Sequence, residues 1–128
     1  MKSPMTKQKF INQWLRHFAR GLSKKQRETY VDNQFIWHVF SFDLIPCRGL
    51  LKGNAARDAF DRVKKNDCIS CDLFGIGVMD QLPDEWNTAA KIEGNPLEFY
   101  VVAKDFSWTY IKTHEGDLCG PYFLRLEK

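Results

Sequence analysis

The apolar positions near the start of the chain follow the pattern of an amphipathic helix. Six apolar side chains recur at intervals of three and four residues and would form one stripe: Phe10, Ile11, Trp14, Leu15, Phe18 and Leu22. The pattern predicts a helix over residues 6–22, with Thr6 as a start signal and Gly21 suited to a left-handed C-cap. Ser23 and Gln26 have the spacing of a capping box, which predicts a second, short helix to about Val31.

The residues from 35 to 42 (FIWHVFSF) are aromatic or β-branched, without glycine or proline, and predict a strand. Alternate side chains on both faces of this strand would be apolar, so we expect an interior strand that is covered on two sides. Further strands are expected over 68–79, 97–103, 106–113 and 121–126. Lys104 and Asp105 would turn a hairpin between two of them, and the last strand would lie at the sheet edge.

Residues 54–65 predict another helix, because Ala55, Ala56, Ala59, Phe60 and Val63 would form a modest apolar face. Asn54 would cap its start, and lysines 64 and 65 suit its C-terminal end. A short helical turn is expected over residues 84–90. The order of elements predicts an α+β fold over a single domain, 1–128. Its N-terminal helices (6–31) and one further helix would pack on one face of a mostly antiparallel sheet of four to five strands formed by residues 35–127.

Composition agrees with a folded domain. The chain has 128 residues, of which 44% are hydrophobic, 27% charged and 14% aromatic, so it can bury a core filled with large rings. The formal charge of +3 is unevenly spread: residues 1–30 hold eight basic side chains and one acidic, whereas residues 66–128 hold five basic and eleven acidic. This division suggests two faces of opposite charge.

The chain start lacks the apolar core of a signal peptide, and no apolar run approaches the ~18 residues of a membrane span. We therefore expect a cytoplasmic protein without a membrane partner. The four cysteines, Cys47, Cys68, Cys71 and Cys119, would then be reduced thiols.

Cys68 and Cys71 form a C-x-x-C pair, to which His114 and Cys119 could add two ligands for a zinc-stabilised domain. On a regular strand, however, residues three apart point to opposite faces and cannot share one metal ion. The alternative interpretation is that both cysteines are buried small side chains. We predict no metal and no other cofactor.

Two histidines offer a second chemistry. His38 and His114 could act as general base and acid of a metal-independent nuclease or hydrolase. The competing interpretation is that His38, within an apolar segment, is a buried neutral side chain bonded to a neighbour.

An acidic segment surrounds Trp86. Asp80, Asp84, Glu85 and Glu93 lie near this ring in sequence, and Asp117 follows later. Carboxylates around an exposed tryptophan suit a basic partner, because the ring anchors and the charges steer. Alternatively, the loop is simply solvated and Trp86 turns into the core. Arg16, Arg20, Lys24, Lys25 and Arg27 could touch nucleic acid, but no nucleic-acid-binding motif accompanies them, so we expect none to bind.

Three stretches resemble a family of small bacterial proteins known only as a domain of unknown function. They are WHVFSF (37–42) with Pro46 and Cys47, DFSWT (105–109), and THE (113–115) followed by GPYF (120–123). The motif residues that we single out are Trp37, His38, Trp108, His114, Glu115, Gly120, Pro121 and Tyr122. The resemblance covers about residues 35–125 and does not include the C-x-x-C pair.

Such small aromatic-rich proteins are similar to immunity proteins, which neutralise a cognate toxin in toxin–antitoxin or contact-dependent inhibition systems. The resemblance implies a non-enzymatic protein whose partner is a toxin, for example a nuclease with a basic groove. An acidic surface containing Asp80, Asp84, Glu85, Trp86, Glu93 and Asp117 would bind it. We predict no small-molecule ligand. The histidine-based hydrolase and the zinc-stabilised domain stay open as alternatives.

Overall fold

The computed structural model describes residues 6–31, 36–41, 44, 49–65, 67–72, 77–79, 81–82, 84–93, 98–113 and 120–126, the side chains of residues 30, 41 and 85 excepted. The helical elements are α1 (Lys7–Phe18), α2 (Lys24–Gln26), the π-helical η1 (Arg27–Val31), α3 (His38–Ser41), α4 (Asn54–Arg62), the 3₁₀ turn η2 (Asp84–Trp86) and α5 (Ala89–Glu93). The strands are β1 (Leu51–Lys52), β2 (Cys68–Asp72), β3 (Gly77–Met79), β4 (Phe99–Ala103), β5 (Trp108–Lys112) and β6 (Tyr122–Arg125).

The strands form one antiparallel sheet in the order β1-β6-β5-β4-β2-β3, which confirms the α+β fold. The sheet has six strands, one more than the upper end of our prediction. Lys104 and Asp105 lie in the turn of the predicted β4–β5 hairpin, which pairs Val101 with Tyr110. Every residue of β2, β4 and β5 is buried, so water reaches neither face of the central strands.

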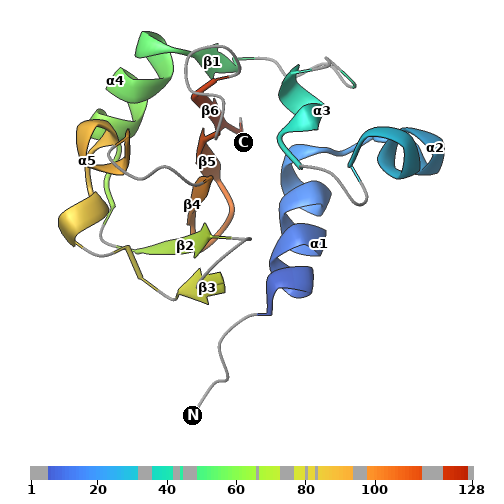
Figure 1. Cartoon of the computed structure of the whole chain (residues 1–128), viewed down its shortest axis with the longest axis horizontal. Helices are drawn as coiled ribbons and strands as arrows, with labels where there is room; N and C mark the ends of the chain where they lie inside the picture. The colour runs from blue at the N-terminus through green and yellow to red at the C-terminus, as the bar shows by residue number, and fades with distance from the viewer. Residues whose placement is uncertain are drawn as a thin grey trace.

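Helices cover both faces of the sheet, whereas the sequence predicted them on one face. Figure 1 shows α1, α2 and α3 on one side of the sheet and α4 and α5 on the other. Alternate residues of β4 accordingly enter two cores: Tyr100 and Val102 join α1 and α3, and Phe99 and Val101 join α4 and α5. The fold therefore has three layers.

The first helix confirms its predicted stripe. Thr6 caps α1 by accepting a hydrogen bond from the Lys9 backbone N–H at 3.1 Å, and Phe10, Trp14 and Phe18 are buried against the sheet. The helix ends at Phe18, four residues earlier than predicted, and Gly21 adopts a φ of 92° in the turn that follows.

The predicted capping box is also present. The Ser23 hydroxyl accepts from the Gln26 N–H, and the Gln26 side chain accepts from the Ser23 N–H, each at 3.0 Å. The helix that follows continues as the π-helical η1 to Val31, the predicted end. The sequence did not indicate this change of helix type.

The strand predicted over residues 35–42 is wrong, because residues 38–41 form the helix α3. Ile36, Trp37, Val39 and Phe40 are all buried in the first core. An apolar segment without polar alternation fits a buried helix as well as a buried strand, and here tertiary packing decides between them. Pro46 and Cys47 lie outside the described residues.

Two further strand predictions and one helix cap need correction. The segment 68–79 is a pair of strands, β2 and β3, with Ser70 opposite Met79, instead of one strand. The last strand, β6, is not at the edge: the short β1, which the sequence did not predict, pairs with it through Leu51 and Phe123. In the 54–65 helix, Gly53 takes the N-cap position and Asn54 is the first helical residue. The expected turn over residues 84–90 is η2 and the start of α5.

If both helical layers are integral to the fold, equivalent core truncations on the two faces should cost similar stability. Phe10 of α1 and Phe60 of α4 are both fully buried. We expect Phe10→Leu and Phe60→Leu each to lower the free energy of unfolding by about 1–2 kcal/mol. Urea denaturation measures this, with Leu51→Ala on the exposed β1 as a control that changes it little. A negligible effect of Phe60→Leu would show that α4 is only loosely attached.

Candidate functional site

A buried carboxylate lies where α3 meets the start of β4. Glu98 is only 2% exposed, and its Oε1 accepts a hydrogen bond from the Trp37 indole Nε1 at 2.6 Å. Its Oε2 accepts from the Tyr100 hydroxyl at 3.3 Å. A buried charge costs several kcal/mol unless hydrogen bonds satisfy it, and these donors meet that condition. The Glu98 cluster, consisting of Glu98, Trp37 and Tyr100, therefore joins α3 to the sheet.

Electrostatics around the Glu98 cluster agree with this geometry. Burial raises the pKa of Tyr100 well above its usual range, and the neighbouring Glu98 charge raises it further. Tyr100 therefore keeps its proton and remains a donor. On β5, burial lowers the pKa of Lys112, while Glu93 and Glu98 act in the opposite direction. The sequence analysis missed Glu98. It could have been found because Glu98, Tyr100 and Val102 are spaced two residues apart, which places the carboxylate on the same buried face as the two apolar side chains.

His38 lies beside the Glu98 cluster. Its ring packs edge-on against Trp37, with 4.6 Å between ring centroids, and the side chain is half-buried. Its predicted partner, His114, and the neighbouring Glu115 lie outside the described residues. The pairing of the two histidines thus stays a prediction.

The other described motif residues have structural contacts. Trp108 stacks on Phe123 at 5.7 Å and meets Phe60 edge-on at 6.1 Å. Gly120 has a φ of 108°, and a Cβ there would come within 3.2 Å of the Tyr122 ring, so this position requires glycine. The Pro121 carbonyl accepts from the Gly53 N–H at 2.9 Å, which attaches the β1–α4 connection to β6.

The predicted acidic surface is only partly formed by the described residues. Asp84 is exposed at the start of η2. Trp86 is half-buried and meets Phe99 edge-on at 4.8 Å, so it packs on the sheet as the alternative interpretation held. The Glu93 carboxylate pairs with the Arg57 guanidinium. Asp80, Asp117 and the side chain of Glu85 lie outside the described residues.

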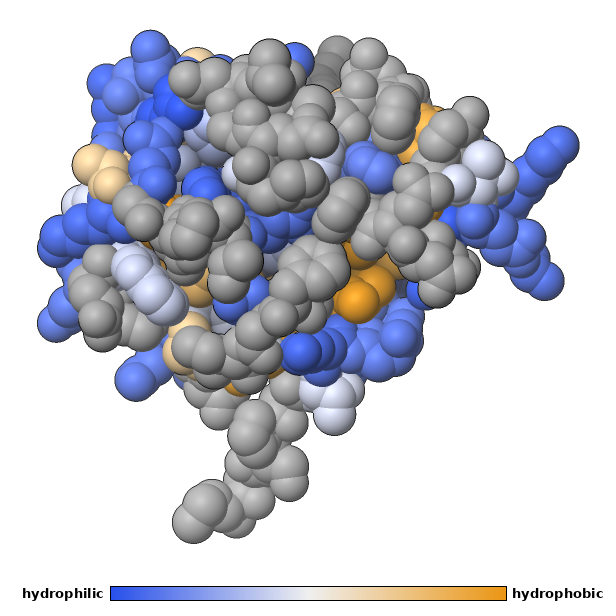
Figure 2. Space-filling model, in the orientation of Figure 1, coloured by the Kyte–Doolittle hydropathy of each residue, from blue (hydrophilic) through white to orange (hydrophobic). Residues whose placement is uncertain are grey.

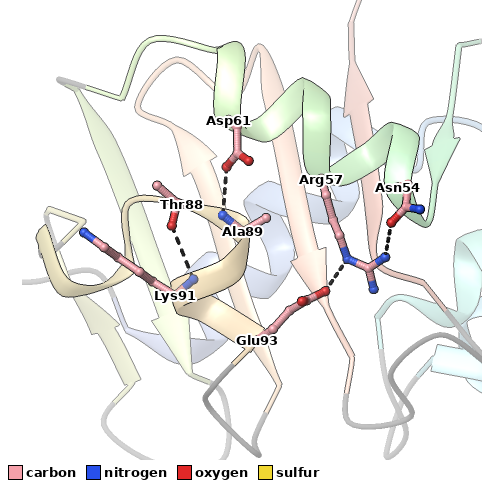
Figure 3. A network of polar contacts seen from close by, with 7 residues as sticks. All are labelled: Asn54, Arg57, Asp61, Thr88, Ala89, Lys91 and Glu93. Carbon is pink, nitrogen blue, oxygen red and sulfur yellow. Dashed lines mark hydrogen bonds and ion pairs between the residues drawn. The ribbon is translucent and has the colours of Figure 1, made fainter.

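Glu93 belongs to a polar network that connects α4 to α5 (Figure 3). The Asp61 carboxylate accepts from the Ala89 N–H at 2.8 Å at the start of α5, and Arg57 also donates to Asn54 at 2.7 Å. The Lys91 ammonium donates to the Asp84 carbonyl at 3.2 Å. We call this group the α4–α5 network; its bonds hold the two helices and η2 in one arrangement.

One buried hydroxyl beneath the α4–α5 network has no hydrogen-bond partner among the described residues. Tyr110 is fully buried and stacks on Phe60 at 4.2 Å between ring centroids, but its hydroxyl bonds to no group in the part of the chain that the structure describes. Burial raises the Tyr110 pKa, and the Glu93 charge adds to this effect. The hydroxyl is therefore neutral and costs desolvation without compensation.

The cysteine pair cannot share a metal ion. Cys68 joins the core under α4 and α5, whereas Cys71 joins the core under α1 and α3, as predicted for strand residues three apart. Burial raises the pKa of Cys68, and it raises that of Cys71 to about 12. Among the residues that the structure describes, no three His, Cys, Asp or Glu side chains are grouped for a metal. His114 and Cys119 lie outside the description.

Two recesses open on the described surface. One, of about 420 Å³, lies at the β4–β5 turn and has charges of both signs, including an ion pair between Lys104 and Asp67 at 3.2 Å. The other, of about 230 Å³, lies between α1 and α2 and is lined by Arg16, Arg20 and Arg27. Figure 2 shows hydrophilic side chains extending into solvent on the side where α2 lies. None of the described helices is long and apolar enough to cross a membrane.

Fold and surfaces together define a small α+β domain with an antiparallel sheet between two helical layers. The chain belongs to the family Domain of unknown function (DUF4275), whose model matches residues 2–123. This confirms the predicted membership of a family of unknown function. The chain matches no curated protein and no solved structure.

The two core tyrosines should respond differently to loss of their hydroxyl groups. Tyr100→Phe removes a donor from the buried Glu98 carboxylate, so we expect the free energy of unfolding to fall by about 1–2 kcal/mol. Tyr110→Phe removes an unbonded hydroxyl and should leave stability unchanged or slightly higher. Urea denaturation at pH 7 compares the two variants. Equal losses would contradict the assigned bonding.

The raised thiol pKa values predict slow alkylation of the native protein. At pH 8 Cys68 and Cys71 are protonated and buried, so iodoacetamide should modify them roughly a hundredfold more slowly than in urea. Peptide mass spectrometry measures both rates. Equal alkylation rates with and without urea would contradict the buried placement of the two thiols.

The native state holds the Cys71 proton more tightly than the unfolded chain. The contribution of this thiol to the free energy of unfolding should therefore fall as pH rises from 9 towards 12.

Proposed function

We propose that this chain is a non-enzymatic protein that binds and neutralises a partner protein, as immunity proteins do. The observation that carries the proposal is the hydrogen-bonded polar surface of the α4–α5 network. Side chains that already hold one arrangement lose little conformational entropy when a partner docks. A surface of this kind suits recognition of another folded protein.

The charges on this surface divide into two roles. Glu93 is paired with Arg57, so it supplies shape and directed hydrogen bonds more than net charge. Asp84 is exposed and forms no ion pair with any described residue, so its carboxylate is available to steer a basic partner. The adjoining Glu85 adds a second negative charge to this segment. A toxin with a basic substrate groove is the partner that this arrangement fits.

The burial of three motif residues supports the same proposal. Trp37, Trp108 and Tyr122 are buried in the two cores, where their rings pack against other aromatic side chains. These three motif residues are thus accounted for by fold stability, and in this proposal exposed side chains recognise the partner.

A histidine-based hydrolase is the second candidate. Trp37 bonds to Glu98, and Glu98 precedes Phe99, which is paired with Lys112. Trp37, Glu98 and Lys112 therefore lie at one end of the sheet, while position 114 lies outside the described residues. Under this alternative, purified protein would cleave RNA with a bell-shaped pH profile, and His38→Ala would abolish the activity. Purified protein without such cleavage would eliminate the candidate.

The binding proposal predicts one stoichiometric partner. Tagged protein should capture from its own organism a protein with toxic activity, and an equimolar mixture should suppress that activity. Asp84→Lys should weaken the complex by about tenfold, because it places a repulsive charge in the contact. The matched control is Glu28→Lys, which makes the same charge change on η1, across the sheet. Equal effects of the two variants, or capture of nucleic acid alone, would overturn the proposal.

A further inference from the structure

The recess between α1 and α2 combines arginine side chains with an apolar floor. Leu15 and Ala19 are buried to 6% and 4% exposure, and Leu22 is half-buried. Arg16, Arg20 and Arg27 line the same recess, whose volume is about 230 Å³. The recess therefore offers guanidinium groups above a surface that would take an apolar side chain.

Two of these arginines, Arg16 and Arg20, come from the end of α1 and the turn after it and line the same recess. Residues 1–30 contain one acidic side chain, Glu28, and it lies 3.9 Å from Lys24 in an exposed pair. Arg16 and Arg20 form no ion pair with any residue that the structure describes. Arg16 lies in the last turn of α1, where the helix dipole favours a cation, but Arg20 follows the helix end and adds a second positive charge. A bound anion would reduce the repulsion between them.

One of the arginines is held in place. The Arg27 guanidinium donates to the Asn12 side-chain oxygen of α1 at 3.1 Å, and the capping box of Ser23 and Gln26 fixes the start of α2. Arg27 begins the π-helical η1, and π-helical turns are frequent at functional sites. The two walls of the recess are thus joined by a hydrogen bond and keep their separation.

We infer that this recess binds an acidic peptide segment of a partner protein, with an apolar side chain on Leu15, Ala19 and Leu22 and flanking carboxylates on Arg16 and Arg20. Guanidinium groups bind carboxylates through paired hydrogen bonds, which gives both charge and orientation. A peptide can place an apolar side chain on this floor and carboxylates on the arginines at the same time, which matches both features of the recess.

This surface is separate from the one in the proposed function. The helices α1 and α2 lie on the opposite side of the sheet from α4 and α5 (Figure 1). The acidic-peptide site therefore does not depend on the neutralising role, and both surfaces could be occupied at once.

NMR titration of the isotope-labelled protein tests the inference. The probe is an acetylated peptide with the sequence Glu-Glu-Leu-Glu-Glu-Leu-Glu at low salt. We expect amide shifts confined to α1, α2 and η1. Replacing both leucines of the probe by serine should weaken binding by about tenfold, because the apolar contact is lost. A thymidine oligonucleotide of equal length should bind more weakly than the peptide.

A charge-reversed protein provides the matched comparison. Arg16→Glu with Arg20→Glu should weaken peptide binding by about a hundredfold. The control, Arg62→Glu with Arg125→Glu, changes the net charge equally on exposed positions of α4 and β6 and should bind as the parent does. Amide dispersion shows that both variants fold. No shifts, equal losses in the two variants, equal binding of the serine peptide, or tighter binding of the oligonucleotide would each overturn the inference.

Discussion

The burial of the central strands on both faces is the constraint on which the rest of the structure depends. Every residue of β2, β4 and β5 is buried, so a polar group among them costs free energy unless it bonds inside the protein, as the Tyr110 hydroxyl does not among the described residues. Thr109 illustrates this: its hydroxyl accepts from the Trp14 indole at 3.0 Å and donates to the Val101 carbonyl at 3.3 Å. One threonine thereby bonds α1 to the sheet and bridges two strands.

The same constraint explains two of the buried tryptophans. An indole fills a large volume but carries one N–H that must be satisfied. Trp14 directs its N–H to Thr109 and Trp37 directs its N–H to Glu98, so both bonds cross from a helical layer to the sheet. These bonds specify where α1 and α3 lie, which apolar packing alone would leave less defined. The Glu98 carboxylate is thus part of the architecture.

Both proposed binding sites lie on outer surfaces of the protein. The α4–α5 surface has charges of both signs that neutralise one another, as Glu93 and Arg57 do. The α1–α2 recess keeps an excess of positive charge beside apolar side chains. The excess of basic residues in the N-terminal part of the sequence is therefore found on the surface at the α1–α2 recess. The excess of acidic residues in the C-terminal part is less exposed, because Asp72 and Glu98 are buried. The two surfaces would suit partners of different chemistry.

The sequence by itself determined the elements whose signals are local. The stripe of α1, the capping box of α2 and the β4–β5 hairpin follow from side-chain periodicity and from hydrogen bonds within a few residues. Alternation along β2 likewise predicted that Cys68 and Cys71 would separate to opposite faces. Each of these features depends only on neighbours along the chain.

Tertiary structure alone decided the features that depend on distant residues. Residues 38–41 are helical, β6 is internal and α4 covers the second face because of packing against residues far away in sequence. For the candidate site, the sequence identified Trp37 and His38 as motif residues but neither the Glu98 carboxylate beside them nor the pairing of Glu93 with Arg57. The sequence of an apolar segment does not specify which element will cover it, and the sequence around a charged residue does not specify its ion-pair partner. Both are determined by which distant segments the fold brings together.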